Sequence, residues 1–172
     1  MTKRFSITEP ILWLFVILMG ITMGAGIYEA RVLVPLWSAA APDSVIAFYH
    51  HNAANPQFAP DQGGNFWVIV TPLTTLTTIA LLISSFWTQG LQRKLLVGAS
   101  VTAMIVQAAT FAWFVPNIIR LFGSDVLTMN RDEITTLVSS WVNLNWLRAV
   151  LLFTAWTFSL LAIRLSTRQS FQ

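Results

Sequence analysis

The chain contains no cysteine and few charges: Lys, Arg, Asp and Glu together make up 10% of its 172 residues. Without cysteine there can be no disulfide, thiol catalysis, cysteine-ligated cluster or covalently attached c-type haem. No nucleotide-binding glycine loop, nucleophile elbow or zinc-protease motif occurs. The small excess of cations forms no basic run, so the sequence predicts no nucleic-acid partner.

Apolar residues dominate the remainder, at 55% of the chain, with twelve Phe and eight Trp. The mean hydropathy of +0.65 is typical of a protein whose partner is the lipid bilayer. A helix needs about 20 apolar residues to cross a bilayer core. The sequence therefore predicts an all-α integral membrane four-helix bundle, a single domain over 1–172. Its spans are predicted at about 10–34, 66–87, 95–115 and 142–163.

Prolines mark the predicted helix ends. Pro35 and Pro116 are expected to end the first and third helices, because proline lacks the N–H that a continuing helix requires. Pro72 lies inside the second helix, where neighbouring threonines can bond to the carbonyls it frees. A tight turn is predicted over 89–94.

Two long outer loops are predicted to carry short helices. The first loop, 36–65, contains PDSVIAFYHHNA, an amphipathic helix beginning at Pro42, followed by Asn55-Pro56, Ala59-Pro60 and Gly63-Gly64. The second, 121–140, contains Asn130-x-x-Glu133, which resembles a capping box leading into the fourth helix.

The distribution of positive charge predicts the orientation. The positive-inside rule places Lys- and Arg-rich ends in the cytoplasm. The cations near the termini and the short turn are Lys3, Arg4, Arg93, Lys94, Arg164 and Arg168. Both termini are therefore predicted to be cytoplasmic, in a cell inner (plasma) membrane. The first apolar run exceeds the 7–15 residues of a signal peptide, so we expect it to be a retained helix.

Gly20 and Gly24 form a GxxxG pattern, which predicts a close-packing seam and a homo-oligomer through these two glycines. At 100° per residue, Arg31 falls on the same face. Glu29 falls on the opposite face, so it and Arg31 are not expected to neutralise each other.

Arg148 stands inside the last apolar span, where an ionised side chain is costly and marks a functional hypothesis. Trp141, Asn145 and Arg148 share one helix face. With Asn117 at the outer end of the third helix, they predict a polar pocket in the outer leaflet. There Arg148 would hold an anion, Glu29 or His50 would move a proton, and the asparagines would orient a ligand.

Structural alternatives stand beside this hypothesis. Glu29 and Arg148 can pair simply to satisfy two charges. His50 with Glu29 can contribute to a metal site, although His50 and His51 are adjacent and cannot chelate as i, i+4 histidines do. No cofactor is predicted. The tryptophans expected to lie at membrane interfaces, mostly as anchors, are Trp13, Trp37, Trp67, Trp87 and Trp141.

Short motifs resemble one known family, the small four-helix membrane proteins called anthrone-oxygenase-like. The resemblance rests on a glycine-rich first helix leading to Tyr28, on the run from Val34 to Trp37, on Pro116-Asn117, and on WVNLNWLR with Trp141, Asn145 and Arg148. Family members often carry a threonine between that proline and asparagine, which this chain lacks.

The resemblance implies a membrane oxidoreductase that oxidises an anthrone to an anthraquinone with dioxygen and no cofactor. Glu29 or His50 would be the base and Arg148 would hold the anion. The substrate-binding residues would be Arg31, Asn117, Trp141 and Asn145. The alternative is a non-enzymatic membrane protein that binds a hydrophobic small molecule or serves as an accessory subunit.

Overall fold

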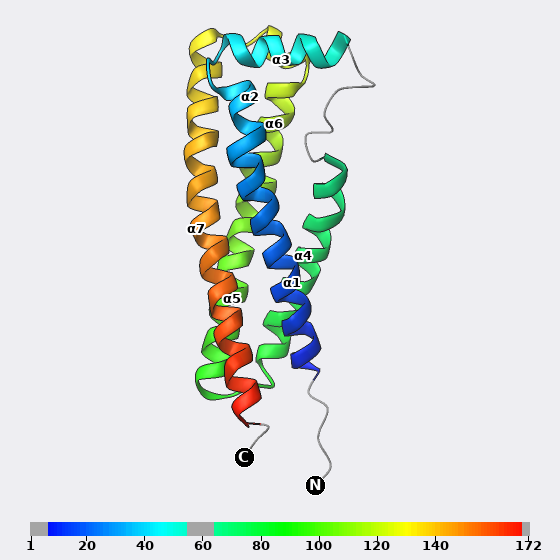
Figure 1. Ribbon diagram of the computed structural model, residues 1–172, viewed down its shortest axis with the longest axis vertical. Coiled ribbons are helices and arrows are strands. Elements are labelled where there is room, and N and C mark those ends of the chain that lie inside the picture. The colour runs from blue at the N-terminus through cyan, green and yellow to red at the C-terminus, as the bar shows by residue number, and fades with distance from the viewer. Residues whose placement is uncertain (1–6, 55–63, 170–172) are drawn as a thin grey trace. The chain divides into compact units, whose positions relative to one another are not determined.

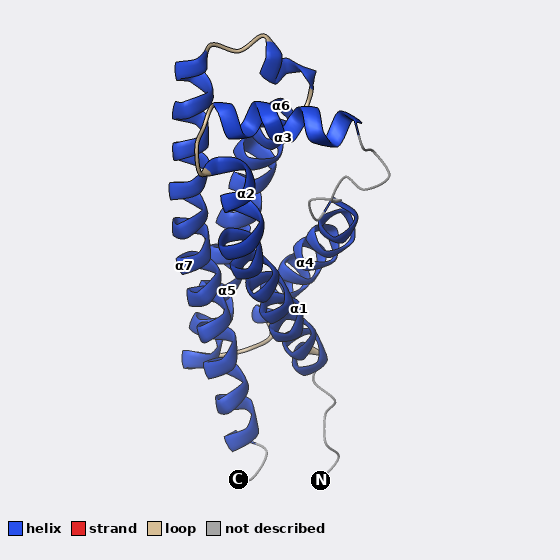
Figure 2. Cartoon of the chain, turned by 45° about the horizontal axis from the view of Figure 1, so that its top comes forward, coloured by secondary structure: helices blue, strands red, loops and turns tan. Residues whose placement is uncertain are grey.

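The computed structural model describes residues 7–54 and 64–169, and every regular element within these ranges is a helix (Figure 2). Lys3, Arg4, Asn55-Pro56, Ala59-Pro60 and Gly63 lie outside the described residues. Four helices are long and apolar enough to cross a membrane: Thr8–Ser38, Asn65–Ser85, Gly90–Phe122 and Arg131–Ser166. This confirms the all-α prediction and indicates a multi-pass membrane protein.

The described residues form helical elements of three types, some within the four long helices and some between them. In chain order they are α1 (Thr8–Tyr28), the π-helical η1 (Glu29–Leu33), α2 (Val34–Ser38), α3 (Asp43–Ala54), α4 (Gly64–Ser85), α5 (Gly90–Ala109), the π-helical η2 (Thr110–Phe114), α6 (Val115–Phe122), the 3-10 helix η3 (Ser124–Leu127) and α7 (Arg131–Gln169) (Figure 1).

The predicted helix ends at Pro35 and Pro116 are wrong, and both errors have the same cause. A π-helical turn precedes each proline, with the N–H of Val34 donating to Glu29 C=O and that of Val115 donating to Thr110 C=O. Each proline then enters in the first turn of a new α-helical segment, where its missing N–H costs nothing. The wider turn therefore lets the helix axis continue through the proline.

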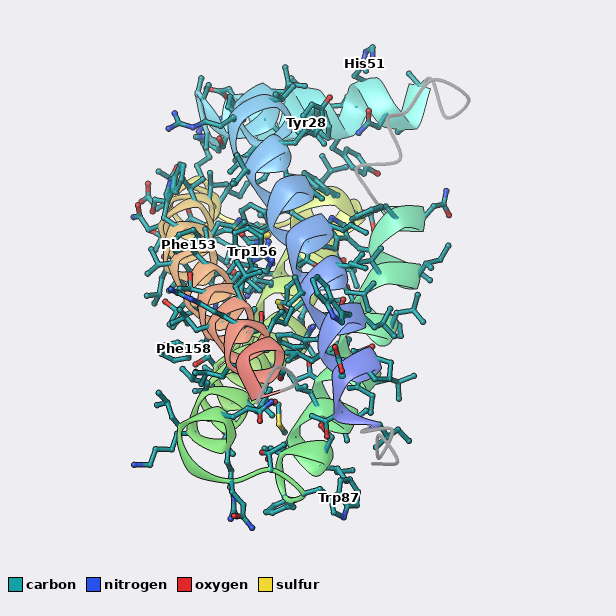
Figure 3. The ribbon with its side chains drawn as sticks, turned by 60° about the horizontal axis from the view of Figure 1, so that its bottom comes forward. Tyr28, His51, Trp87, Phe153, Trp156 and Phe158 are labelled. Atoms are coloured by element: carbon teal, nitrogen blue, oxygen red, sulfur yellow. The ribbon has the colours of Figure 1, made fainter. Side chains whose placement is uncertain are left out.

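Two other boundaries also differ from the prediction. The turn between α4 and α5 covers 86–89, not 89–94, and Gly90 begins α5 with φ of 61°, a left-handed conformation that glycine adopts readily. Trp87 lies in this turn (Figure 3). The fourth helix, α7, runs from Arg131 to Gln169, well beyond 142–163. The short helix predicted from Pro42 is α3.

The chain divides into two compact units. Unit 1 comprises Met1–Met23, Ile69–Gln107 and Val150–Gln172. Its core draws buried side chains from α1, α4, α5 and α7: Leu12, Phe15, Val16, Met19, Leu81, Leu96, Ala99, Ala103, Val106, Leu152, Ala155 and Ala162. Four of these residues are alanine. Small residues let helix backbones approach closely, as is usual in membrane proteins.

Polar groups in unit 1 bond mainly within their own helices. Thr74 Oγ1 donates to Val70 C=O and Thr78 Oγ1 to Thr74 C=O. These acceptors differ from the Val68 carbonyl that Pro72 leaves without an N–H donor, so these bonds do not provide the predicted compensation. Trp156 Nε1 of α7 donates to Val16 C=O of α1 at 3.2 Å (Figure 3).

Unit 2 comprises Gly24–Val68 and Ala108–Ala149. Its core is richer in aromatic and branched residues: Val34, Trp37, Val45, Phe114, Leu121, Val126, Ile134, Val138 and Trp141. Two exposed salt bridges connect its elements, Arg131–Asp43 between α7 and α3 at 2.8 Å and Arg120–Glu133 between α6 and α7 at 2.7 Å.

The predicted capping box is half correct. Asn130 Oδ1 accepts the N–H of Asp132 at 3.0 Å, as an N-cap side chain does. Glu133 bonds to Arg120 instead of returning to the cap.

Candidate functional site

Glu29 opens the π-helical turn η1 in unit 2, at a position set by the proline that follows. Its side chain is partly buried, and its Oε1 accepts a hydrogen bond of 2.7 Å from Trp67 Nε1 of α4. π-helical turns inside α-helices occur frequently at functional sites. Trp67 was expected to be an interfacial anchor, and the sequence carries no signal for its contact with a residue 38 positions earlier.

Arg148 is the cation whose charge acts on this carboxylate within unit 2. The two groups attract each other, yet the hydrogen-bond partner of Glu29 among the described residues is Trp67 and not Arg148. The guanidinium carbon of Arg148 lies 4.6 Å from the centre of the Phe114 ring, in cation–π geometry. Arg148 thus lies against an aromatic face and acts on Glu29 at longer range than a direct salt bridge.

A cavity of about 60 Å³ lies beside Glu29. The lining comes from η1, α2, α3, α6 and α7 and consists of Glu29, Leu33, Val34, Leu36, Trp37, Phe48, Ile118, Phe122 and Trp141. Glu29 is the one ionisable residue in this lining. A site of this kind, apolar with a single polar group, suits a hydrophobic ligand with one reactive position.

Aromatic contacts fix the cavity wall. The Trp37 ring packs edge-on against Trp141 and Phe122, with centroids 5.3 and 5.2 Å apart, and Trp141 packs against Phe114 at 5.7 Å. Edge-to-face pairs of this geometry are favourable. Trp37 was predicted to be an interfacial anchor, but it is only 4% exposed and belongs to the core of unit 2.

Two of the seven residues predicted for the site, Glu29 and Trp141, line the cavity. Arg148 does not line the cavity, and its positive charge attracts Glu29 from outside it. Arg31 is exposed and lies over Trp146, 5.1 Å from the ring centre, which agrees with its predicted separation from Glu29.

The remaining three predicted site residues also lie outside the lining. Asn117 Nδ2 donates to Trp113 C=O of its own helix at 2.8 Å. Asn145 is partly buried on α7. His50 is exposed on α3, with its ring 5.5 Å from Tyr49, and does not line the cavity. The structure therefore does not bring His50 to the cavity beside Glu29.

A metal site at Glu29 and His50 would need further protein ligands close by. Among residues 7–54 and 64–169, no group of three or more His, Cys, Asp or Glu side chains could hold an ion. A pair made of Glu29 and His50 would thus have no third protein ligand of these types in the described part of the chain.

The two glycines of the predicted seam have different surroundings. A Cβ added at Gly20 would lie 3.7 Å from Trp156 Nε1, an ordinary contact inside unit 1. A Cβ added at Gly24 would meet nothing within 4 Å. Gly20 therefore packs within the chain, and a homo-oligomer through both glycines stays a prediction.

Comparison of the chain with protein families, curated proteins and solved structures finds no match. The likeness to anthrone-oxygenase-like proteins accordingly stays a prediction from short motifs.

Proposed function

We propose that this protein is a membrane oxidoreductase that binds a hydrophobic aromatic or quinone-like molecule in the cavity of unit 2 and uses Glu29 as a base. One observation carries the proposal: a single carboxylate borders an otherwise apolar and aromatic cavity. A carboxylate in such a place can take a proton from a bound molecule while the surrounding hydrocarbon excludes water.

The aromatic wall supports an aromatic guest. Trp37 and Trp141 already pack edge-to-face, and a flat ring entering beside them would continue the same geometry. The cavity has room for about four water molecules at roughly 15 Å³ each. One edge of a fused ring system would therefore enter, next to Glu29.

The reaction that fits the motif resemblance is oxidation of an anthrone by dioxygen. Glu29 would remove a proton from the acidic carbon, and the resulting carbanion would react with oxygen. Overall, one anthrone and one O₂ give one anthraquinone and one H₂O. Arg148 would stabilise the negative charge through space, since a cation outside the cavity still acts in a medium of low dielectric constant.

The proposed location follows the predicted orientation: a cell inner membrane, with both termini cytoplasmic and the cavity in the outer leaflet. Arg93, Lys94 and Arg164 supply the positive-inside signal among the described residues.

Oxygen uptake by the detergent-purified protein with anthrone tests the proposal. We expect Glu29→Gln to lower turnover at least about 100-fold, the usual contribution of a general base. The matched control is Glu9→Gln, an exposed glutamate near the start of Thr8–Ser38, the long helix that also carries Glu29, and it should leave turnover unchanged. Equal oxygen uptake by the wild type, both variants and empty micelles would reject the enzymatic role.

A non-enzymatic binding protein is the second candidate function. It is favoured by the same cavity lining, which contains one ionisable group and neither His50 nor Arg148. Saturable binding of anthrone without oxygen uptake would support this candidate over the first.

A further inference from the structure

The turn between α4 and α5 places aromatic and basic side chains together on the surface of unit 1. Phe86 and Trp87 are 63% and 70% exposed, and Leu91 in the first turn of α5 is 61% exposed. Figure 3 shows Trp87 on the outside of this turn. Arg93 and Lys94 follow in α5 and are also exposed. These five residues, here called the turn surface, combine apolar area with two positive charges.

Arg93 is held against the exposed rings of this surface. Its guanidinium carbon lies 5.5 Å from the centre of the Phe86 ring, in cation–π geometry. Phe86 follows α4 and Arg93 belongs to α5, so the contact spans the turn. Aromatic rings are enriched at membrane–water interfaces, where they lie at the level of the lipid headgroups. The turn surface therefore has a composition that suits a headgroup.

The described part of the chain supplies no counter-charge for these two cations. Arg93 and Lys94 form no salt bridge with the described residues, whereas the exposed Arg120 and Arg131 of unit 2 each bond to a carboxylate. By sequence, unit 1 contains six Lys and Arg residues and a single acidic residue, Glu9. Cations near the start of a helix gain nothing from its dipole, so helix stability does not account for them. The positive charge is left for an anion from outside the chain.

We propose that the turn surface binds an acidic phospholipid of the leaflet next to the turn. Arg93 and Lys94 pair with the charged headgroup, and the rings of Phe86 and Trp87 lie against the upper part of its acyl chains. A soluble anion would leave the rings in water, and a neutral lipid would leave the charges without a counter-charge. This site lies outside the cavity beside Glu29 and does not depend on the proposed function.

Quenching of tryptophan fluorescence by brominated lipids tests the proposal. The purified full chain is reconstituted in phosphatidylcholine vesicles containing a small, equal fraction of brominated phosphatidylglycerol or brominated phosphatidylcholine, with bromine near the headgroup end of an acyl chain. The part of the quenching that is lost in Trp87→Phe reports the lipid at the turn surface. We expect its association constant to be about thirtyfold higher for phosphatidylglycerol, since each basic side chain near anionic lipid contributes about fivefold.

A pair of double variants with equal change in net charge separates this surface from the charge of the whole protein. Arg93→Gln with Lys94→Gln should abolish the preference, while quenching by phosphatidylcholine stays unchanged and shows that the variant is folded. The matched control, Arg120→Gln with Arg131→Gln, removes two exposed cations of unit 2 and should retain the preference. High salt should weaken the wild-type preference, because it screens exposed charges.

Three results would overturn the proposal. The first is equal association of the two lipids with the wild type, or a preference that persists without Arg93 and Lys94. The second is an equal loss in the control variant, because net charge would then attract the lipid. The third is quenching at Trp87 that is absent with both lipids and returns on dilution of the protein in the vesicles, because a second copy would then cover the turn. None of these results concerns Glu29, so the proposed function stands or falls separately.

Discussion

Units 1 and 2 bury different chemistry. The buried polar side chains found in the described residues all belong to unit 1: Thr8, Thr22, Thr74, Thr77, Thr78, Ser84, Ser85, Ser100, Gln107 and Ser159. Unit 2 instead contains the partly buried charges Glu29 and Arg148 and the buried rings of Trp37, Phe114 and Trp141. One unit is packed with small hydroxyl and alanine side chains, the other with charges and aromatic rings.

The side chains of unit 1 serve helix packing, whereas those of unit 2 surround a cavity. Small side chains allow helices to approach closely, and most hydroxyls of unit 1 bond to carbonyls of their own helices. The cavity beside Glu29 lies in unit 2, next to rings that pack edge-to-face. A ligand is therefore expected in unit 2, and three changes test this division, from the largest expected effect to the smallest.

Trp37→Ala should have the largest effect on stability. It removes a core ring that contacts Trp141 and Phe122, so we expect a loss of about 3–5 kcal/mol in the free energy of unfolding. Denaturant titration in detergent measures this loss. Trp87→Ala, at a position 70% exposed in a turn, is the control and should change stability little. Similar losses in both variants would remove Trp37 from the core of unit 2.

The second change compares added volume in the two units. Ala99→Leu enlarges a fully buried side chain of unit 1, and overpacking of this kind costs about 1–3 kcal/mol. Val34→Leu adds a methylene beside the cavity of unit 2. This change should leave the free energy of unfolding unchanged or raise it by up to about 1 kcal/mol. Thermal unfolding of both variants measures the contrast. If Val34→Leu is the more damaging, the cavity beside Val34 does not accommodate the added methylene.

The smallest effect concerns the charges of unit 2. A double-mutant cycle on Glu29→Gln and Arg148→Gln should give a coupling energy of about 1 kcal/mol, because the two groups attract each other without a direct hydrogen bond. The control cycle combines Glu29→Gln with Arg31→Gln. Because Arg31 lies over Trp146, this cycle should give a coupling energy near zero. Equal coupling in the two cycles would mean that Arg148 has no special relation to Glu29.

The number of long apolar helices could be predicted because it depends on local composition. A run of apolar residues long enough to cross a bilayer identifies itself without knowledge of its neighbours. Helix ends were less predictable, since proline was read as a terminator at Pro35 and Pro116. A π-helical turn before each proline lets the helix continue past it. The sequence gives no separate signal for such a turn.

The candidate site was predicted in part. Helical periodicity grouped Trp141, Asn145 and Arg148 on one face, yet of these only Trp141 lines the cavity. His50 illustrates a signal that was present and not used. Val45 is fully buried and Phe48 lines the cavity, and their i, i+3 spacing defines the inner face of α3. His50 does not belong to that face and is exposed.

Amino-acid content alone was enough to indicate an all-helical chain with four apolar helices and to single out Glu29 and Arg148, because hydropathy and charge are properties of each residue and its near neighbours. The folded chain alone decided that Trp67 bonds to Glu29, that Trp37 and Trp141 form one wall, and that a cavity remains beside them. These features depend on which side chains from distant segments meet, and no local pattern specifies that meeting.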